Sequence, residues 1–209
     1  MPTSPWNSIT PIMDIVMGLS PRPDRILDVG IGFGKYGFLC REYLSYWNLP
    51  DIPRQMVIDG IEAFPDYAGD LQRGIYDELH LGDALGVLEK MPPGDYDLVL
   101  LIDVIEHFSR DAGLRLLGQC RRVGKAVIVS TPRRFWPQEA AWDNPWEVHK
   151  SLWSRADLRR AGAVRIIKQE NWIAVFAAPP YREYFSLRCR LWKIRQRLLR
   201  IFTKEMRTG

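Results

Sequence analysis

The chain has 209 residues with a formal net charge of +4, and 46% of its residues are hydrophobic. This composition is typical of a soluble globular domain and excludes a disordered or fibrous chain. Apolar runs such as Leu98–Ile102 are far too short to span a bilayer, and the three cysteines form no CxxC pair. We therefore expect a cytoplasmic protein with reduced thiols, no signal peptide and no thiolate zinc site.

Strand and helix patterns alternate along most of the chain. Short apolar runs predict strands at 25–29, 55–63, within 77–85, at 95–103 and at 123–131. Helical spacing predicts helices at 9–18, 35–47, 108–120 and 154–161. Strand patterns at 163–170 and 171–179, joined at Gln169–Asn171, predict a hairpin. The expected fold class is α/β: an open, mostly parallel sheet with an antiparallel edge hairpin and helices on both faces.

The first strand runs into ILDVGIGFGKYG, which can be read in two ways. From Gly30 it is GxGxG behind Asp28, and from Gly32 it is the GxGxxG of a dinucleotide site. Gly30, Gly32 and Gly34 let the backbone turn sharply and lie against a ligand. A carboxylate two residues before the loop suits a cationic group better than a diphosphate, but the loop alone leaves both ligands open.

The next two strands also end at acidic residues. Glu62, at the tip of the second strand, can accept hydrogen bonds from both hydroxyls of a ribose, which both ligands contain. Asp83, in the triplet Gly82–Asp83–Ala84, can accept a hydrogen bond from an adenine amine or can cap the following helix. Ligands of open α/β sheets bind beyond the carboxyl ends of the strands, which is where these residues are expected.

Taken together, ILDVGIGFG, the acid in GIEAF, LGDAL and DLVLLIDVIEHF resemble the ordered motifs of class I S-adenosylmethionine (SAM)-dependent methyltransferases. The resemblance covers residues 20–180 and implies a seven-stranded sheet with an antiparallel last strand. It assigns the methionine pocket to Gly30, Gly32 and Gly34, the methionine ammonium to Asp28, the ribose to Glu62 and the adenine to Asp83 and Ala84. Asp103, which ends the fourth strand, completes the expected cofactor set. The GxGxG reading is then preferred, and Gly37 serves close helix–sheet packing.

The acceptor side is predicted from IDVIEHF and from the aromatic-rich segment 135–153. Asp103, Glu106 and His107 have the spacing that places three residues on one face of a helical turn. In one mechanism His107 or His149 is the general base for a hydroxyl acceptor, with Asp103 beside it. In the other, Asp103, Glu106, His107 and His149 bind a divalent metal, an arrangement similar to the ExxEH…H ligands of small-RNA 2′-O-methyltransferases, with Asp replacing the first Glu.

The segment 135–153 contains four tryptophans: Trp136, Trp142, Trp146 and Trp153. Long loops of this kind act as lids over ligands, and the alternative is surface packing without a ligand. With STPRR before it, the segment is similar to bacterial methyltransferases of the type 11 and 12 group, which does not identify a substrate.

The basic charge is concentrated at the end of the chain. Residues 181–209 carry a net charge of +7, whereas residues 1–180 carry −3. Within 184–202 an apolar stripe alternates with arginines, which predicts a basic amphipathic helix on an anionic membrane surface. Packing on the body, homodimer formation and RNA binding remain alternatives. We expect a methyltransferase domain at 1–180 and a separate tail at 181–209.

These patterns predict a SAM-dependent methyltransferase that O-methylates a small-molecule, sugar or lipid-linked glycan acceptor, in the cytoplasm and peripherally at the inner face of the membrane. The chain lacks the (N/D)PP(Y/F) motif and the Pro-Cys pair of DNA methyltransferases, so a nucleic-acid acceptor is not expected. Two rivals remain: a non-catalytic SAM-binding module that works through its basic tail, and an NAD-dependent oxidoreductase.

Overall fold

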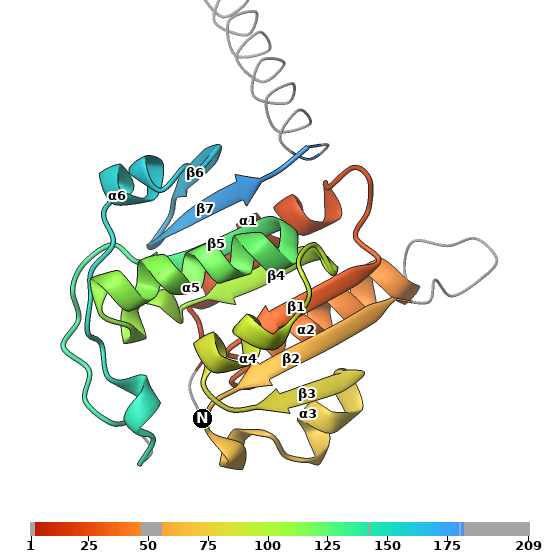
Figure 1. Ribbon diagram of the computed structural model, residues 1–209, viewed down its shortest axis with the longest axis horizontal. Helices are drawn as coiled ribbons and strands as arrows, with labels where there is room; N and C mark the ends of the chain where they lie inside the picture. The colour runs from red at the N-terminus through yellow and green to blue at the C-terminus, as the bar shows by residue number, and fades with distance from the viewer. Residues whose placement is uncertain (1–2, 47–55, 142, 180, 182–209) are drawn as a thin grey trace, which may run out of the picture.

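The computed structural model describes residues 3–46, 56–141, 143–179 and 181, and its centre is a seven-stranded sheet (Figure 1). The strands are β1 (Arg25–Val29), β2 (Val57–Glu62), β3 (Glu78–Leu81), β4 (Tyr96–Ile102), β5 (Gly124–Pro132), β6 (Arg165–Lys168) and β7 (Asn171–Ala177). They are ordered β3-β2-β1-β4-β5-β7-β6. Every pairing from β3 to β5 is parallel, and β7 is antiparallel to both β5 and β6. The predicted fold class is confirmed.

Helices cover both faces of the sheet (Figure 1). On one face lie α1 (Ile9–Met17), α2 (Lys35–Cys40) and α3 (Asp70–Ile75), and on the other lie α4 (Ala84–Lys90), α5 (Arg110–Val123) and α6 (Arg155–Arg160). The apolar run of β4 serves both layers, because Leu98 and Leu100 belong to the first core cluster and Val99 and Leu101 to the second. Burial on both faces is why this strand reads as a continuous apolar run.

Side-chain caps mark the start of α4 and α6. Asp83 accepts a hydrogen bond from the Gly86 amide at the start of α4, so its capping role is realised. Ser154 and Asp157 form a capping box at the start of α6. The helix expected at 35–47 is α2 followed by a π-helical turn at Arg41–Tyr46. Short 3-10 turns lie at Trp6–Ser8, Pro65–Tyr67, Ile105–His107 and Pro145–Glu147.

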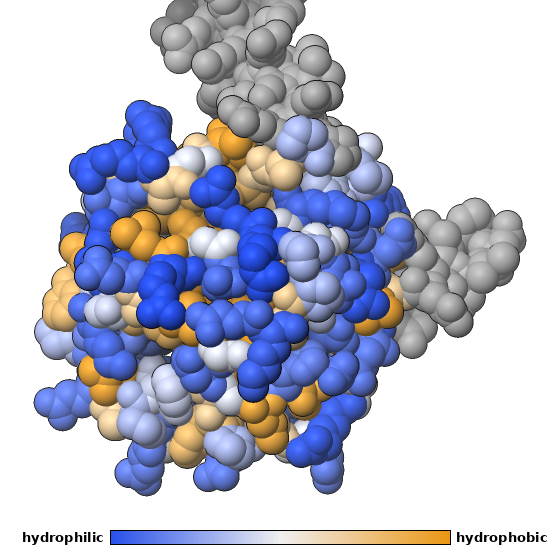
Figure 2. All heavy atoms as spheres, in the orientation of Figure 1, coloured by the Kyte–Doolittle hydropathy of each residue, from blue (hydrophilic) through white to orange (hydrophobic). Residues whose placement is uncertain are grey.

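The layer of α4 and α5 presents a mainly hydrophilic surface with scattered apolar side chains (Figure 2). Leu114 of α5 is a half-exposed apolar residue. Scattered apolar residues of this kind are ordinary on a soluble domain. No helix in the described part of the chain is both long and apolar enough to cross a membrane. Tyr181, the first residue of the predicted tail, is buried in the core, and the predicted amphipathic helix at 184–202 lies outside the described residues.

Candidate active site

A pocket of about 670 Å³ lies at the carboxyl ends of the parallel strands. Because these ends share one edge of the sheet, motifs that are far apart in the sequence meet there. The lining includes seven of the eight residues predicted to bind the cofactor: Asp28, Gly30, Gly32, Glu62, Asp83, Ala84 and Asp103. Glu106, His107 and His149 line the same pocket, so the predicted donor and acceptor residues share one cavity.

The glycine loop connects β1 to α2 through left-handed backbone. Gly30, Gly32 and Gly34 have φ of +73°, +50° and +83°, which L side chains rarely adopt. A Cβ on Gly30 would also lie 2.5 Å from the side chain of Val104. Gly34 is absent from the pocket lining. Its role in the structure is to complete the turn, because its backbone N–H donates a hydrogen bond to the Ile31 carbonyl.

Glu62 is fixed in place by backbone amides. It is 5% exposed and accepts hydrogen bonds from Gly32 at 3.2 Å and from Phe64 at 2.8 Å. Burial raises the pKa of its carboxyl above the usual value, and these amides oppose that rise. The tip of β2 therefore carries a pre-oriented acceptor of hydrogen bonds beside the glycine loop.

Asp28 lies at the floor of the pocket and is 3% exposed. Its Oδ2 accepts a 2.6 Å hydrogen bond from the Tyr76 hydroxyl, and burial raises the pKa of its carboxyl to about 7. The tyrosine ring also explains Gly37, because a Cβ there would lie 2.5 Å from ring atoms. Gly37 was expected to allow close packing of the helix on the sheet, and this expectation needs correction. The missing side chain of Gly37 instead leaves room for the ring of Tyr76, which follows α3.

Asp103 departs from the predicted helical turn. The turn begins only at Ile105, and Asp103 has a left-handed φ of +55° at the end of β4. Its Oδ1 instead accepts hydrogen bonds from Ser130 at 2.7 Å and Asn171 at 2.6 Å, on β5 and β7. Its Oδ2 is buried without a partner among the described residues, and burial raises the pKa of the carboxyl to about 6. A non-glycine residue in this conformation is a strained position of the kind found at functional sites.

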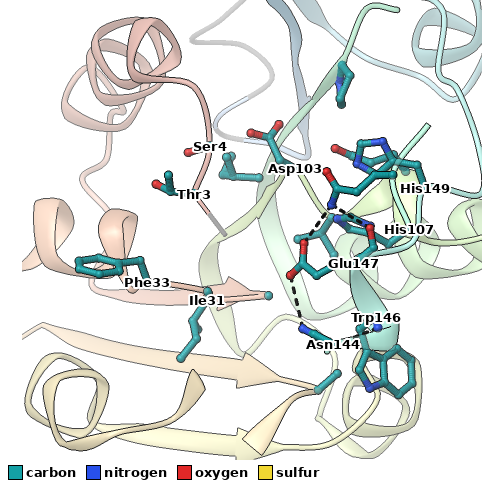
Figure 3. Close-up of a pocket in the computed structure, with 18 of the residues that line it drawn as sticks. Thr3, Ser4, Ile31, Phe33, Asp103, His107, Asn144, Trp146, Glu147 and His149 are labelled. Atoms are coloured by element: carbon teal, nitrogen blue, oxygen red, sulfur yellow. Dashed lines mark hydrogen bonds between the residues drawn. The ribbon is translucent and has the colours of Figure 1, made fainter. Parts of the chain in front are cut away.

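Glu106, His107 and His149 do come together, with one ligand atom from each within 4.8 Å of the others. Asp103 is not part of this group, so the four-residue set predicted from the sequence is reduced to three, because Asp103 binds Ser130 and Asn171 instead. The two imidazole rings are 5.0 Å apart (Figure 3).

Backbone carbonyls hold both imidazole rings. His107 Nδ1 lies 3.3 Å from the Val148 oxygen, and His149 Nδ1 lies 2.7 Å from the Trp136 oxygen. These contacts assign the proton to Nδ1 of each ring, so Nε2 is the basic nitrogen of the neutral imidazole. Burial, with the nearby His149, lowers the pKa of His107 to about 4. Beside them, Glu106 is buried and accepts a hydrogen bond from Thr131.

The segment 135–153 forms the wall opposite the glycine loop. Figure 3 shows Asn144, Trp146 and Glu147 across the cavity from Ile31 and Phe33. Trp136 and Trp146 line the pocket and remain 71% and 39% exposed. Trp153 instead lies in the core beneath the Arg110 guanidinium, and Trp142 lies outside the described residues.

Several pocket residues escaped the sequence reasoning. Glu147 accepts hydrogen bonds from Gln138 and Asn144, and burial, with the charge of Glu62, raises the pKa of its carboxyl to about 7. Lys35 directly follows the glycine loop, and its Nζ donates to the Ser4 carbonyl. The position of Lys35 after the loop was a usable signal, whereas nothing local in the sequence connects Ser4 or Glu147 with the site.

Comparisons with known proteins identify the fold. No protein-family model and no curated protein matches the chain by sequence. A SAM-dependent methyltransferase from Archaeoglobus fulgidus superposes with a TM-score of 0.55 at 18% identity, covering 77% of this chain and 68% of that one. The bifunctional kinase-methyltransferase WbdD gives 0.58 at 18% identity, covering 82% of this chain and 39% of that one. An O-methyltransferase family protein from Burkholderia thailandensis gives 0.52 at 14% identity, covering 79% and 55%. The chain thus has the class I SAM-dependent methyltransferase fold and spans less than half of WbdD.

Proposed function

We propose that the protein is a SAM-dependent methyltransferase that transfers the methyl group to an oxygen of a small-molecule, sugar or lipid-linked glycan acceptor. The observation that carries this proposal is the order of the polar groups along the sheet edge. Asp83 follows β3, Glu62 is the last residue of β2, and Asp28 lies near the end of β1. Asp103 directly follows β4. Adenine, ribose, methionine and the transferred methyl group would lie along the pocket in that sequence.

The same order weakens the dinucleotide alternative. A pyrophosphate against the glycine loop would face Asp28, a buried carboxyl with no salt-bridge partner among the described residues. An ammonium group at this point instead gains a favourable charge interaction. The oxidoreductase reading also leaves the paired histidines without a function.

SAM supplies an electrophilic methyl group, so the remaining task of the protein is to align the acceptor, exclude water and take up a proton. Backbone carbonyls hold the Nδ1 side of His107 and His149, so the basic nitrogen of each ring is Nε2, which suits one of them for accepting the proton of a hydroxyl. Asp103, anchored by Ser130 and Asn171 at the end of β4, lines the pocket between the donor and acceptor sides.

The acceptor wall favours a ring with several hydroxyl groups. Trp136 and Trp146 offer exposed flat apolar surfaces, while Gln138, Asn144 and Glu147 supply amide and carboxyl groups beside them. Aromatic faces and planar hydrogen-bonding groups together suit a sugar ring, which is apolar on its faces and polar at its rim. The O-methyltransferase name of a structural neighbour supports oxygen as the accepting atom.

A divalent metal at Glu106, His107 and His149 is a second candidate, favoured by the hydrogen bonds of both histidines to backbone carbonyls. Such bonds orient imidazole rings whose other nitrogen binds a metal. The donor set of one carboxylate and two imidazoles fits such an ion, which would hold an acceptor oxygen and lower its pKa. Asp103 is not included in this version of the site.

The direct test is incubation with methyl-tritiated SAM and fractionated host lysate, counting label in lipid, glycan, small-molecule, RNA and protein fractions. We expect label in the glycan, lipid or small-molecule fraction, and its loss in Glu62→Ala. Label confined to RNA or protein would contradict the proposed acceptor class. Cofactor binding with no label in any fraction, with Mg²⁺ or Mn²⁺ added, would favour the non-catalytic binding module.

A further inference from the structure

Lys35 is a pocket cation whose structural partners are uncharged. Its Nζ donates to the Ser4 carbonyl oxygen at 2.7 Å and lies 3.3 Å from the Ser4 hydroxyl. It forms no salt bridge within the described part of the chain, although it lines a pocket that also contains carboxylates. Burial lowers the pKa of Lys35, which reflects the cost of removing the ammonium group from water.

The position of Lys35 limits what it can bind. It directly follows the glycine loop of β1, and Asp103 at the end of β4 is close enough for its charge to raise the pKa of Lys35. Lys35 therefore lies on the β4 side of β1. Glu62 at the end of β2 and Asp83 after β3 lie on the opposite side of β1. The pocket also contains two arginines, Arg133 and Arg134, which follow β5. Arg133 already donates a hydrogen bond to the Gln169 carbonyl.

We propose that Lys35 binds the carboxylate of the amino-acid portion of the cofactor, an inference that rests on the proposed methyltransferase function. Asp28 and Lys35 then form a pair of opposite charges at the same end of the pocket. Asp28 meets the ammonium group and Lys35 meets the carboxylate of the same zwitterion. Both partners of the bond between Lys35 and the carboxylate carry a charge, whereas the present acceptors of Lys35 are neutral oxygens of Ser4.

This assignment also concerns the N-terminal segment, residues 3–7, which Lys35 contacts through Ser4. Ser4 is held by Lys35, and Asn7 Nδ2 donates to Oε2 of Glu170, another pocket residue, at 2.6 Å. Thr3, Ser4 and Pro5 themselves line the pocket, and Figure 3 shows Thr3 and Ser4 on the side of Asp103. The alternative role for Lys35 is to anchor this segment without touching the cofactor.

The experiment compares two ligands that differ only in the carboxylate. Dissociation constants for S-adenosylhomocysteine (SAH) and for decarboxylated SAH are measured by calorimetry with the wild type, Lys35→Met and Lys35→Arg. Lys90→Met, an exposed substitution at the far end of α4, serves as the matched control for loss of one positive charge. Thermal unfolding of each ligand-free variant reports whether the N-terminal segment supports the fold.

We expect Lys35→Met to weaken SAH about tenfold to a hundredfold and to leave decarboxylated SAH unchanged. Lys35→Arg should recover part of the loss, and Lys90→Met should match the wild type. Equal weakening of both ligands would overturn the assignment in favour of the anchoring role, and unchanged affinity for both would overturn it outright. Failure of the wild type to bind SAH at all would instead reject the methyltransferase function, and the assignment with it.

Discussion

Asp28 combines a binding role with a cost in stability. Its carboxyl has a pKa of about 7 in the folded protein and an ordinary value of 3.8. Between these values the folded state holds a proton that the unfolded chain has lost, so this residue lowers stability as the pH rises from about 4 to 7. Above pH 7 the buried charge is present, and the pocket can then attract an ammonium group.

Asp28→Asn should therefore separate stability from binding. The variant should unfold at a higher temperature than the wild type, with a difference that grows as the pH rises from about 4 to 7 and then stays level. Its affinity for SAH at pH 8 should fall about tenfold, because the charge that attracts the ammonium group is gone. Thermal scans across this pH range and titration at pH 8 check both parts, and a variant less stable than the wild type at pH 8 would contradict them.

The histidine pair predicts a loss of turnover without a loss of cofactor affinity. Asn in place of His107 or His149 keeps a donor for the backbone carbonyl but removes the Nε2 base. The more important of the two substitutions should lower kcat about a hundredfold, with SAH affinity unchanged. Normal turnover in both variants would contradict a role for either residue as the base.

Metal chelation distinguishes the two mechanisms at the same residues. With an imidazole base alone, turnover should be indifferent to EDTA. Loss of turnover with EDTA that Mg²⁺ or Mn²⁺ restores would instead assign Glu106, His107 and His149 to a metal.

At the level of single residues, sequence reasoning succeeded where a motif fixes the position on a strand end. Asp28, Glu62 and Asp83 lie at or near the carboxyl ends of their strands, so their meeting in one pocket was predictable from the topology. Ser130 and Asn171 were missed because their role depends on β5 pairing with β4 and on β7 pairing with β5, which their local sequence does not reveal. Asp103 was misplaced because helical spacing was assumed across a residue that has a left-handed backbone.

Helix α5 contains two glycines whose surroundings predict opposite effects of the same substitution. A Cβ on Gly113 would lie 2.7 Å from the Trp153 ring, whereas a Cβ on Gly118 would meet no atom within 4 Å. Gly118→Ala should stabilise the protein by about 0.5–1 kcal/mol, because Ala favours a helix over Gly. Gly113→Ala should destabilise it by about 1–3 kcal/mol through overpacking.

Chemical denaturation of the two variants measures both free energies of unfolding, and each serves as the control for the other. A stabilised Gly113→Ala would mean that Trp153 moves without cost, which would contradict the close packing of α5 against the end of the segment 135–153.

The elements were predictable to different degrees. Continuous apolar runs located β1, β4 and β5 closely, since burial on both faces leaves few polar positions. The 169–171 hairpin was also predicted, but nothing local placed β7 between β5 and β6, because strand order depends on packing between distant elements. The π-helical turn after α2 had no signature in the helical spacing of 35–47.

At the scale of the whole molecule, the division of charge predicts a membrane interaction for the tail. The full-length protein should sediment with anionic liposomes at low salt, because residues 181–209 carry a net charge of +7. Deletion of residues 184–209 should abolish sedimentation, while retaining the buried Tyr181. Equal sedimentation of the truncated protein would exclude the tail as the membrane-binding segment. A change from dimer to monomer on truncation would instead favour self-association through the tail.

The most direct test of the central claim is a calorimetric titration of the purified protein with SAH and, separately, with NADH. Our account predicts saturable one-site binding of SAH, no binding of NADH, and SAH affinity at least tenfold weaker in Glu62→Ala because bonds to the ribose hydroxyls are lost. Binding of NADH without SAH would contradict the account and assign the glycine loop to a dinucleotide.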